Sequence, residues 1–172
     1  MPKILSAKDY RAMPWKNGGG VTRELYRIPH PQDPERFLLR LSMAQVASSG
    51  PFSLFPGIDR TLLLLSGNGV KLFFADEVEV VLDQPLTPLY FAGEDPVECE
   101  LVDGPVEDFN VMVDRGYGRT TVQLSEARSF TSTGTSFVFD PLREQLVILE
   151  KGAQWARQDR HQVIVVDFTE DT

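Results

Sequence analysis

The segment spanning residues 14–24 holds the densest group of side chains that could contact a polar ligand. It reads Pro-Trp-Lys-Asn-Gly-Gly-Gly-Val-Thr-Arg-Glu, and the side chains of interest are Trp15, Lys16, Asn17 and Thr22. Three consecutive glycines let the backbone approach a ligand or a neighbouring strand closely. Neither glycine spacing of a phosphate loop is present. We interpret the segment as a binding element, and the alternative is a bulged strand entry at a barrel rim.

A second group lies in a short strand-like run. In Leu39-Arg40-Leu41-Ser42-Met43-Ala44, period-two alternation places the apolar side chains on one face and Arg40 and Ser42 on the other. If the polar face points into a barrel, Arg40 offers a bidentate fork for a carboxylate and Ser42 a hydroxyl. If that face points to solvent, both are ordinary surface residues.

Two further segments add candidates. Residues 50–60 read Gly-Pro-Phe-Ser-Leu-Phe-Pro-Gly-Ile-Asp-Arg, a rigid turn in which Phe52 is a packing anchor or ligand wall. Arg60 is either half of a weak surface pair with Asp59 or a second anion contact. Asn110 lies inside the apolar run Phe109 to Val113, where burial would oblige its amide to find a hydrogen-bond partner.

Catalytic and metal-binding patterns are scarce. His30 and His161 stand in neither H-x-H nor H-x-x-x-H spacing, so we predict no metal site and no cofactor. Cys99 alternates with glutamates in a strand-like run and is interpreted as a core thiol. Glu24 is a conceivable general base or a structural partner of an arginine, and we predict no catalytic residue.

The elements that must position these residues are predicted to be β-strands. Short apolar runs rich in Val, Leu, Phe and Thr recur between Gly, Pro, Asn and Asp, and no long stretch keeps a helical period. Expected strands are 37–44, 61–65, 70–74, 78–82, 89–91, 97–102, 109–113, 120–124, 129–131, 137–139, 146–149, 154–156 and 163–168. The pattern predicts an all-β sandwich or small barrel.

Several connections are also predicted. Gly67-Asn68-Gly69 accepts positive φ and suggests a tight hairpin between the flanking strands. Residues 29–34 contain three prolines and read as a polar extended loop. Single helical turns are expected at 6–10 and at 142–145.

Composition limits the partners. The chain has 172 residues, is 42% hydrophobic and carries a formal net charge of −8. A chain of this length buries roughly 70% of its unfolded surface, enough for one core. The acidic balance argues against nucleic acid, since phosphate neutralisation needs a basic patch. No signal-like start, no membrane-length apolar run and a single cysteine lead us to expect a cytoplasmic protein without membrane partners.

The quoted segments together resemble the HutD/Ves family in order and spacing. They are the Trp-Lys-Asn-Gly-Gly-Gly segment with Thr-Arg-Glu, then Ser42-Met43-Ala44, then Phe-Ser-Leu-Phe-Pro-Gly-Ile-Asp-Arg, then Asp108-Phe109-Asn110-Val111-Met112. The Phe-Ser-x-Phe-Pro-Gly-x-Asp-Arg stretch is the most specific. After Gly116 no motif matches.

This resemblance implies a cupin-like bicupin, with two β-barrel halves in one chain. We expect one unit over residues 1–172 with approximate halves 1–115 and 116–172 and possible strand exchange. Membership also implies a metal-free protein that binds a histidine-degradation intermediate such as formylglutamate and regulates histidine utilisation. The resemblance carries pocket roles to the residues Trp15, Lys16, Asn17, Thr22, Arg40, Ser42, Phe52, Arg60 and Asn110.

Two other functions remain open from the sequence. One is a metal-independent isomerase or hydrolase acting on a small carboxylic acid, with Glu24 or Lys16 moving a proton. The other is a protein-interaction module, for which an exposed apolar patch is expected. A homodimer is a mild default expectation.

Overall fold

Seventeen strands and two single turns of 3-10 helix follow one another in the computed structural model, which describes residues 1–172. The chain divides into two units, which we call the larger unit (residues 11–116) and the smaller unit (residues 1–10 with 117–172). Antiparallel pairing joins the strands of every sheet. The expected all-β class is confirmed.

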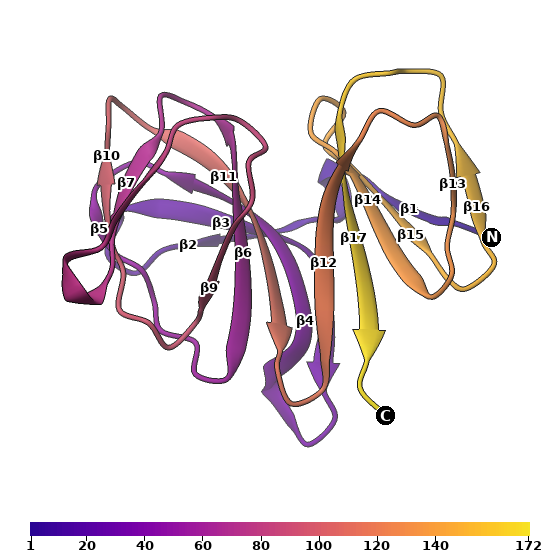
Figure 1. The fold of residues 1–172 in the computed structure, drawn as a ribbon, viewed down its shortest axis with the longest axis horizontal. Helices are drawn as coiled ribbons and strands as arrows, with labels where there is room; N and C mark the ends of the chain where they lie inside the picture. Colours follow the sequence, from indigo (N-terminus) through magenta and orange to yellow (C-terminus); the bar gives the residue numbers. More distant parts are fainter. The chain divides into compact units, whose positions relative to one another are not determined.

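The larger unit contains two sheets (Figure 1). Strand order in the first is β2-β3-β4-β11-β6-β9, and in the second β5-β10-β7-β8. Their bounds are β2 (Arg11–Pro14), β3 (Gly20–His30), β4 (Asp33–Val46), β5 (Gly50–Pro51), β6 (Ile58–Ser66), β7 (Val70–Phe73), β8 (Glu79–Leu82), β9 (Leu89–Ala92), β10 (Glu98–Leu101) and β11 (Val106–Asp114), with a 3-10 turn at η2 (Ala75–Glu77).

Apolar side chains of both sheets form the core of the larger unit. Leu62 and Leu64 of β6 pack with Leu72 of β7 and with Cys99 of β10, and all four are at most 4% exposed. Strand β6 reads Ile-Asp-Arg-Thr-Leu-Leu-Leu-Leu-Ser, so its apolar end lies in this core and its polar end does not. The polar end therefore remains available for a site.

The smaller unit has a five-stranded sheet of order β1-β15-β14-β17-β12 and a two-stranded sheet of β13 and β16. The N-terminal strand thus completes a sheet built by the C-terminal part of the chain. The bounds are β1 (Lys3–Leu5), β12 (Gly118–Ser125), β13 (Ser129–Thr131), β14 (Thr135–Asp140), β15 (Gln145–Leu149), β16 (Gln154–Ala156) and β17 (Val163–Glu170), with a 3-10 turn at η1 (Ala7–Asp9). Neither this unit nor the larger one contains a helix long and apolar enough to cross a bilayer.

The connections differ from the sequence predictions in three places. The hairpin at Gly67 to Gly69 is wrong: β6 and β7 belong to different sheets, and the turn joins them. Both glycines do have positive φ, and a Cβ on Gly67 would lie 2.7 Å from the Pro105 carbonyl oxygen. Glycine at position 67 therefore lets the turn lie close to the backbone of Pro105 and Val106.

The other differences concern a strand and a helical turn. Residues 20–30 form the long strand β3, whose pairing with β4 reaches His30 opposite Asp33, so the predicted loop at 29–34 shrinks to a tight connection. The turn at 6–10 is confirmed as η1, whereas residues 142–145 form no helix.

Candidate functional site

A cavity of about 540 Å³ opens in the larger unit. Such a volume suits a small metabolite. All nine residues singled out in the sequence line it: Trp15, Lys16, Asn17, Thr22, Arg40, Ser42, Phe52, Arg60 and Asn110. The structure therefore places them together, and their contact with a ligand stays a prediction.

The floor of the cavity is one face of the six-stranded sheet. Register places Met112 of β11 between Arg40 of β4 and Arg60 of β6. The next row on the same face places Asn110 opposite Ser42. Side chains at i and i+2 share a face of a strand, and Arg40 and Ser42 both line the cavity, so the polar face of β4 points into the cavity rather than to solvent.

Arg60 is the most buried cation of the site. It is 6% exposed, and its Cζ lies 5.3, 5.4 and 4.9 Å from the ring centroids of Phe52, Phe55 and Phe91. Its Nη2 donates to Asn110 Oδ1 at 3.0 Å, while its buried Nε has no hydrogen-bond partner. Burial lowers the pKa of Arg60 to about 10, with Asp108 opposing the shift, so the guanidinium is still charged at neutral pH.

The surface pair predicted for Asp59 and Arg60 is therefore wrong. The two residues are adjacent in β6 and point to opposite faces of the sheet. Asp59 is exposed and accepts from Arg115 Nε at 2.9 Å. Arg60 lines the cavity instead, and its contact with an anion stays a prediction.

Asp108 is a cavity residue that the sequence-based set did not include. Its Oδ1 accepts from Asn110 Nδ2 at 2.9 Å, and it is 6% exposed. Burial raises the pKa of Asp108 to about 7, although the Arg60 guanidinium acts in the opposite direction. Side chains two residues apart in a strand share a face, so the sequence could have indicated that Asp108 lies on the same face as Asn110.

Arg40 is held by Glu24 of the neighbouring strand. Arg40 Nε lies 2.9 Å from Glu24 Oε2, and both side chains are about 15% exposed or less. Glu24 is thus a structural partner of an arginine, one of the two roles considered for it. The contact uses the Nε edge of the guanidinium, and Arg40 still lines the cavity.

The triple-glycine segment forms the turn between β2 and β3. Trp15 N donates to the Gly20 carbonyl at 2.9 Å, and Trp15 Nε1 donates to Thr22 Oγ1 at 2.8 Å. A Cβ on Gly20 would lie 2.4 Å from the Gln45 carbonyl oxygen and 3.0 Å from the Trp15 ring. Glycine is required there because the indole and strand β4 approach the backbone closely.

Polar groups on this turn and on the floor remain available. Asn17 Oδ1 accepts from Gly19 N at 2.8 Å, which leaves its amide nitrogen without a partner. The Lys16 ammonium and the Ser42 hydroxyl have no side-chain hydrogen bond or ion pair, and both residues line the cavity. These groups match those of a site that binds a polar molecule.

Cys99 is a core thiol, as its strand pattern indicated. It is 4% exposed, and burial raises its pKa to about 12, with the Asp108 carboxyl adding to the shift. A thiol that stays protonated at neutral pH is a poor nucleophile.

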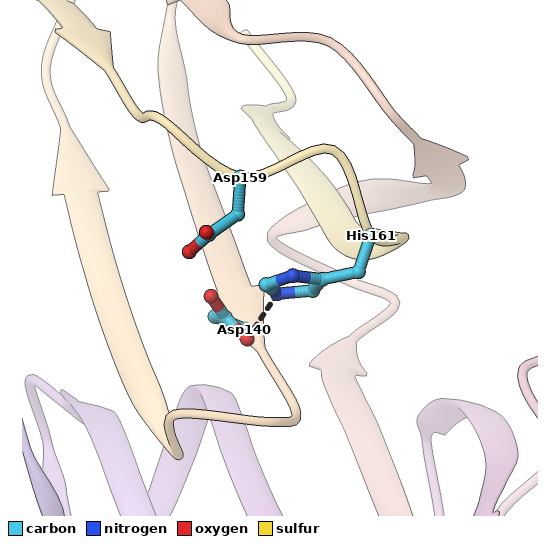
Figure 2. A group of neighbouring side chains, drawn as sticks. All are labelled: Asp140, Asp159 and His161. Carbon is cyan, nitrogen blue, oxygen red and sulfur yellow. Dashed lines mark hydrogen bonds and ion pairs between the residues drawn. The ribbon is translucent and has the colours of Figure 1, made fainter.

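A separate cluster of ionisable side chains lies in the smaller unit. Figure 2 shows Asp140, Asp159 and His161, whose possible ligand atoms lie within 4.8 Å of one another. His161 Nε2 lies 2.8 Å from Asp140 Oδ1, which also accepts from the backbone N–H groups of Leu142 and Arg143. Arg143 Nε donates to Asp159 at 3.0 Å. These hydrogen bonds give the cluster a structural role in holding the turn after β14, and sequence spacing gave no sign of it.

Comparison with known proteins identifies the family. The HutD family model matches residues 7–170. Protein Ves of Cronobacter sakazakii is 37% identical over 158 residues, which cover 86% of this chain and 84% of that protein. An uncharacterized 21.2 kDa protein in the hutC 3′ region of Pseudomonas putida is 36% identical over 142 residues, which cover 80% of this chain and 72% of that protein.

Solved structures agree. The structure of HutD from Pseudomonas fluorescens SBW25 matches over the whole of both chains with a TM-score of 0.86 and 28% identity. Iron(II) HppE matches 64% of this chain and 59% of its own with a TM-score of 0.50 and 14% identity, a likeness of fold alone. The motifs, the fold and these matches lead to one conclusion: the chain belongs to the HutD family.

Proposed function

We propose that the cavity of the larger unit binds a small carboxylate metabolite and that this binding serves a regulatory role in histidine utilisation. The carrying observation is the charge of the cavity. Lys16, Arg40 and Arg60 line it against two carboxylates, that of Asp108 and that of Glu24, which pairs with Arg40, in a chain whose formal net charge is −8. A local excess of cations inside an acidic protein suits an anionic ligand.

The arrangement of these cations supports a carboxylate in particular. Arg40 and Arg60 belong to β4 and β6, which flank β11, so their backbones are about 10 Å apart at the usual strand spacing. Guanidinium groups bind carboxylates with two parallel hydrogen bonds. Phe52 and Trp15 provide apolar surface beside them.

The histidine-utilisation role rests on the family. One relative is named HutD, and another is placed by its name in a hutC 3′ region. Formylglutamate, an acid formed in histidine breakdown, is accordingly the first ligand to test. Its two carboxylates match the two arginines in number.

Thermal unfolding tests the proposal. The purified chain is heated with formylglutamate, formiminoglutamate, urocanate, glutamate or histidine, with EDTA in a parallel series. At about a hundredfold excess over its dissociation constant, a ligand adds roughly 2.7 kcal/mol, a rise of several degrees in Tm. A selective rise that EDTA does not change supports a metal-free acid site, and no rise with any acid contradicts it.

An arginine variant and its control test the site. Arg40→Ala is expected to abolish or strongly reduce the ligand-induced rise while the ligand-free protein still folds. Arg11→Ala removes an exposed cation of β2 that lies outside the cavity, and it should leave the rise unchanged. Equal effects of the two variants would contradict the assignment of Arg40.

A metal-independent isomerase or hydrolase is the second candidate, and one observation favours it. The pKa of Asp108 is raised to about 7, which suits a general base near neutral pH. Product formation from one of the five compounds of the unfolding series that is lost in Asp108→Asn would establish catalysis. Glu24 is less suited, because its carboxylate is engaged by Arg40.

A further inference from the structure

Asp108 occupies a connected chain of buried polar groups on the cavity floor. Arg60 donates to the Asn110 oxygen, and the Asn110 nitrogen donates to Asp108 Oδ1. The amide orientation follows from its two partners, because a guanidinium only donates and must face the amide oxygen. The backbone N–H of Ala44 also hydrogen-bonds the Asp108 carboxyl and favours its ionised form. Asn110 is the side chain that donates to Asp108, and the carboxyl lines the cavity, where it can carry a proton.

The charged groups around Asp108 come from several strands. Arg60 of β6 attracts its negative charge, and Glu107 of its own strand repels it. Cys99 of β10 is coupled to it and remains a neutral thiol. The largest effect is burial, so the carboxyl holds its proton to about pH 7.

Three more ionisable groups share this region. Glu24 of β3 and Arg40 of β4 form an ion pair that is neutral as a whole. Lys16, at the turn between β2 and β3, adds an exposed cation. Neither feature supplies a buried positive charge in contact with Asp108.

A ligand carboxylate bound at Arg60 would place a second acid beside Asp108. Arg60 lines the cavity and already has one acid nearby, and its Nε is buried without a hydrogen-bond partner. Two carboxylates that share a poorly solvated site hold one proton between them, because both cannot ionise at low cost. The arriving anion therefore favours neutral Asp108.

We propose that Asp108 recognises the ligand as a neutral acid, with its O–H donating to the bound carboxylate, so that the cavity takes up one proton with each anion. The proton comes from solvent and no covalent bond changes. This inference rests on the proposed carboxylate site and specifies its chemistry. Asp108 thereby selects an acceptor oxygen at this position and disfavours an amine, which would require the ionised carboxylate.

The consequence is a defined pH dependence. Below about pH 7 free Asp108 already holds the proton, so affinity for the anion is nearly constant. Above it each binding event must draw a proton from solvent, and affinity falls about tenfold per pH unit. Between pH 6 and pH 9 the loss is about a hundredfold.

Isothermal titration calorimetry of the full chain with N-formyl-L-glutamate tests this. Heats measured at each pH in buffers of different ionisation enthalpy give the number of protons taken up. We expect uptake close to one proton at pH 8 and close to none at pH 6. Asp108→Asn keeps a donor without titrating, so it should bind with pH-independent affinity and no uptake. Glu100→Gln removes an exposed acid of β10 and should behave as wild type.

Infrared spectroscopy of the wild type tests the protonation of Asp108 directly, so the test does not depend on whether Asp108→Asn folds. The absorption of a protonated carboxylic acid should be half lost near pH 7 in the free protein and should persist at pH 8 with saturating N-formyl-L-glutamate. Binding with no proton uptake, or affinity that rises with pH, overturns this inference while leaving the carboxylate site standing. No binding at any pH from 6 to 9 overturns both.

Discussion

The ionisation of Asp108 should control how the stability of the larger unit varies with pH. Its pKa is raised from an ordinary 3.8 to about 7, chiefly because the carboxyl is buried. The folded chain therefore holds a proton that the unfolded chain releases between these two values. This stabilising contribution is fully present below about pH 4 and is lost as pH rises through about 7.

The size of the effect follows from the shift. One pKa unit corresponds to about 1.4 kcal/mol, and at pH 5 about two units of the shift are still effective. The free energy of unfolding should therefore fall by about 3 kcal/mol between pH 5 and pH 8 through this group alone. Asp108→Asn cannot ionise, so the difference in stability between variant and wild type should change by that amount, in favour of the variant at pH 8.

Urea unfolding at pH 5, 6, 7 and 8 measures this difference. Trp15 fluorescence in a Trp155→Phe background reports on the larger unit, because Trp15 and Trp155 are the two tryptophans of the chain and belong to different units. A difference between variant and wild type that is constant from pH 5 to pH 8 would refute the reasoning. It would mean that Asp108 ionises at an ordinary pH despite its burial.

Two further predictions concern local structure. Gly20→Ala should displace the Trp15 turn and lower the unfolding free energy by about 1–3 kcal/mol through overpacking. Gly50→Ala should be tolerated, because its Cβ would meet nothing within 4 Å. Urea unfolding of the two variants compares them. Asp140→Ala should lower the unfolding free energy by about 1–3 kcal/mol, because it leaves His161 and the N–H groups of Leu142 and Arg143 without their acceptor. Asp159→Ala breaks an exposed ion pair with Arg143 and should lower it by under about 1 kcal/mol. Thermal unfolding of both aspartate variants measures the contrast, and equal losses would contradict the structural role of Asp140.

The sequence predicted the strands better than their partners. Alternation in Leu39 to Ala44 was enough to identify β4 and its two faces, because a strand has a fixed side-chain period. Which face lines the cavity depends on the two strands that pair with β4. Strand β11 is distant from it in sequence, and strand β3 was not predicted. The same limit explains Gly67 to Gly69: positive φ identifies a turn, but it does not say whether the next strand joins the same sheet.

Strand β3 was missed for a different reason. It begins with glycine and carries Arg23, Glu24 and Arg27, so it lacks the apolar character on which strand prediction relies. Its stability comes from pairing with both β2 and β4. Tertiary pairing overrides the weak local preference of these residues.

The sequence predicted those residues of the site that lie in recognisable motifs. It did not predict the residue whose properties depend on burial. The nine cavity residues came from segments with unusual composition and from the family resemblance. Asp108 was overlooked because its carboxyl looks ordinary in sequence, and only its depth in the structure changes its pKa. The Asp140, Asp159 and His161 cluster likewise depends on a loop that folds back onto β14.

Burial and the charge of Arg60 act in opposite directions on the pKa of Asp108, and a second variant separates the two effects. Arg60→Met keeps much of the apolar volume and removes the cation that favours ionised Asp108. If burial raises the pKa of Asp108 and Arg60 opposes it, the pH at which wild-type stability falls should move upward in Arg60→Met and should vanish in the double variant with Asp108→Asn. A midpoint that stays in place in Arg60→Met would show that the guanidinium does not act on this carboxyl. The cavity cation would then be available to a ligand without competition from Asp108, and the proton-coupled mode of binding would lose its cause.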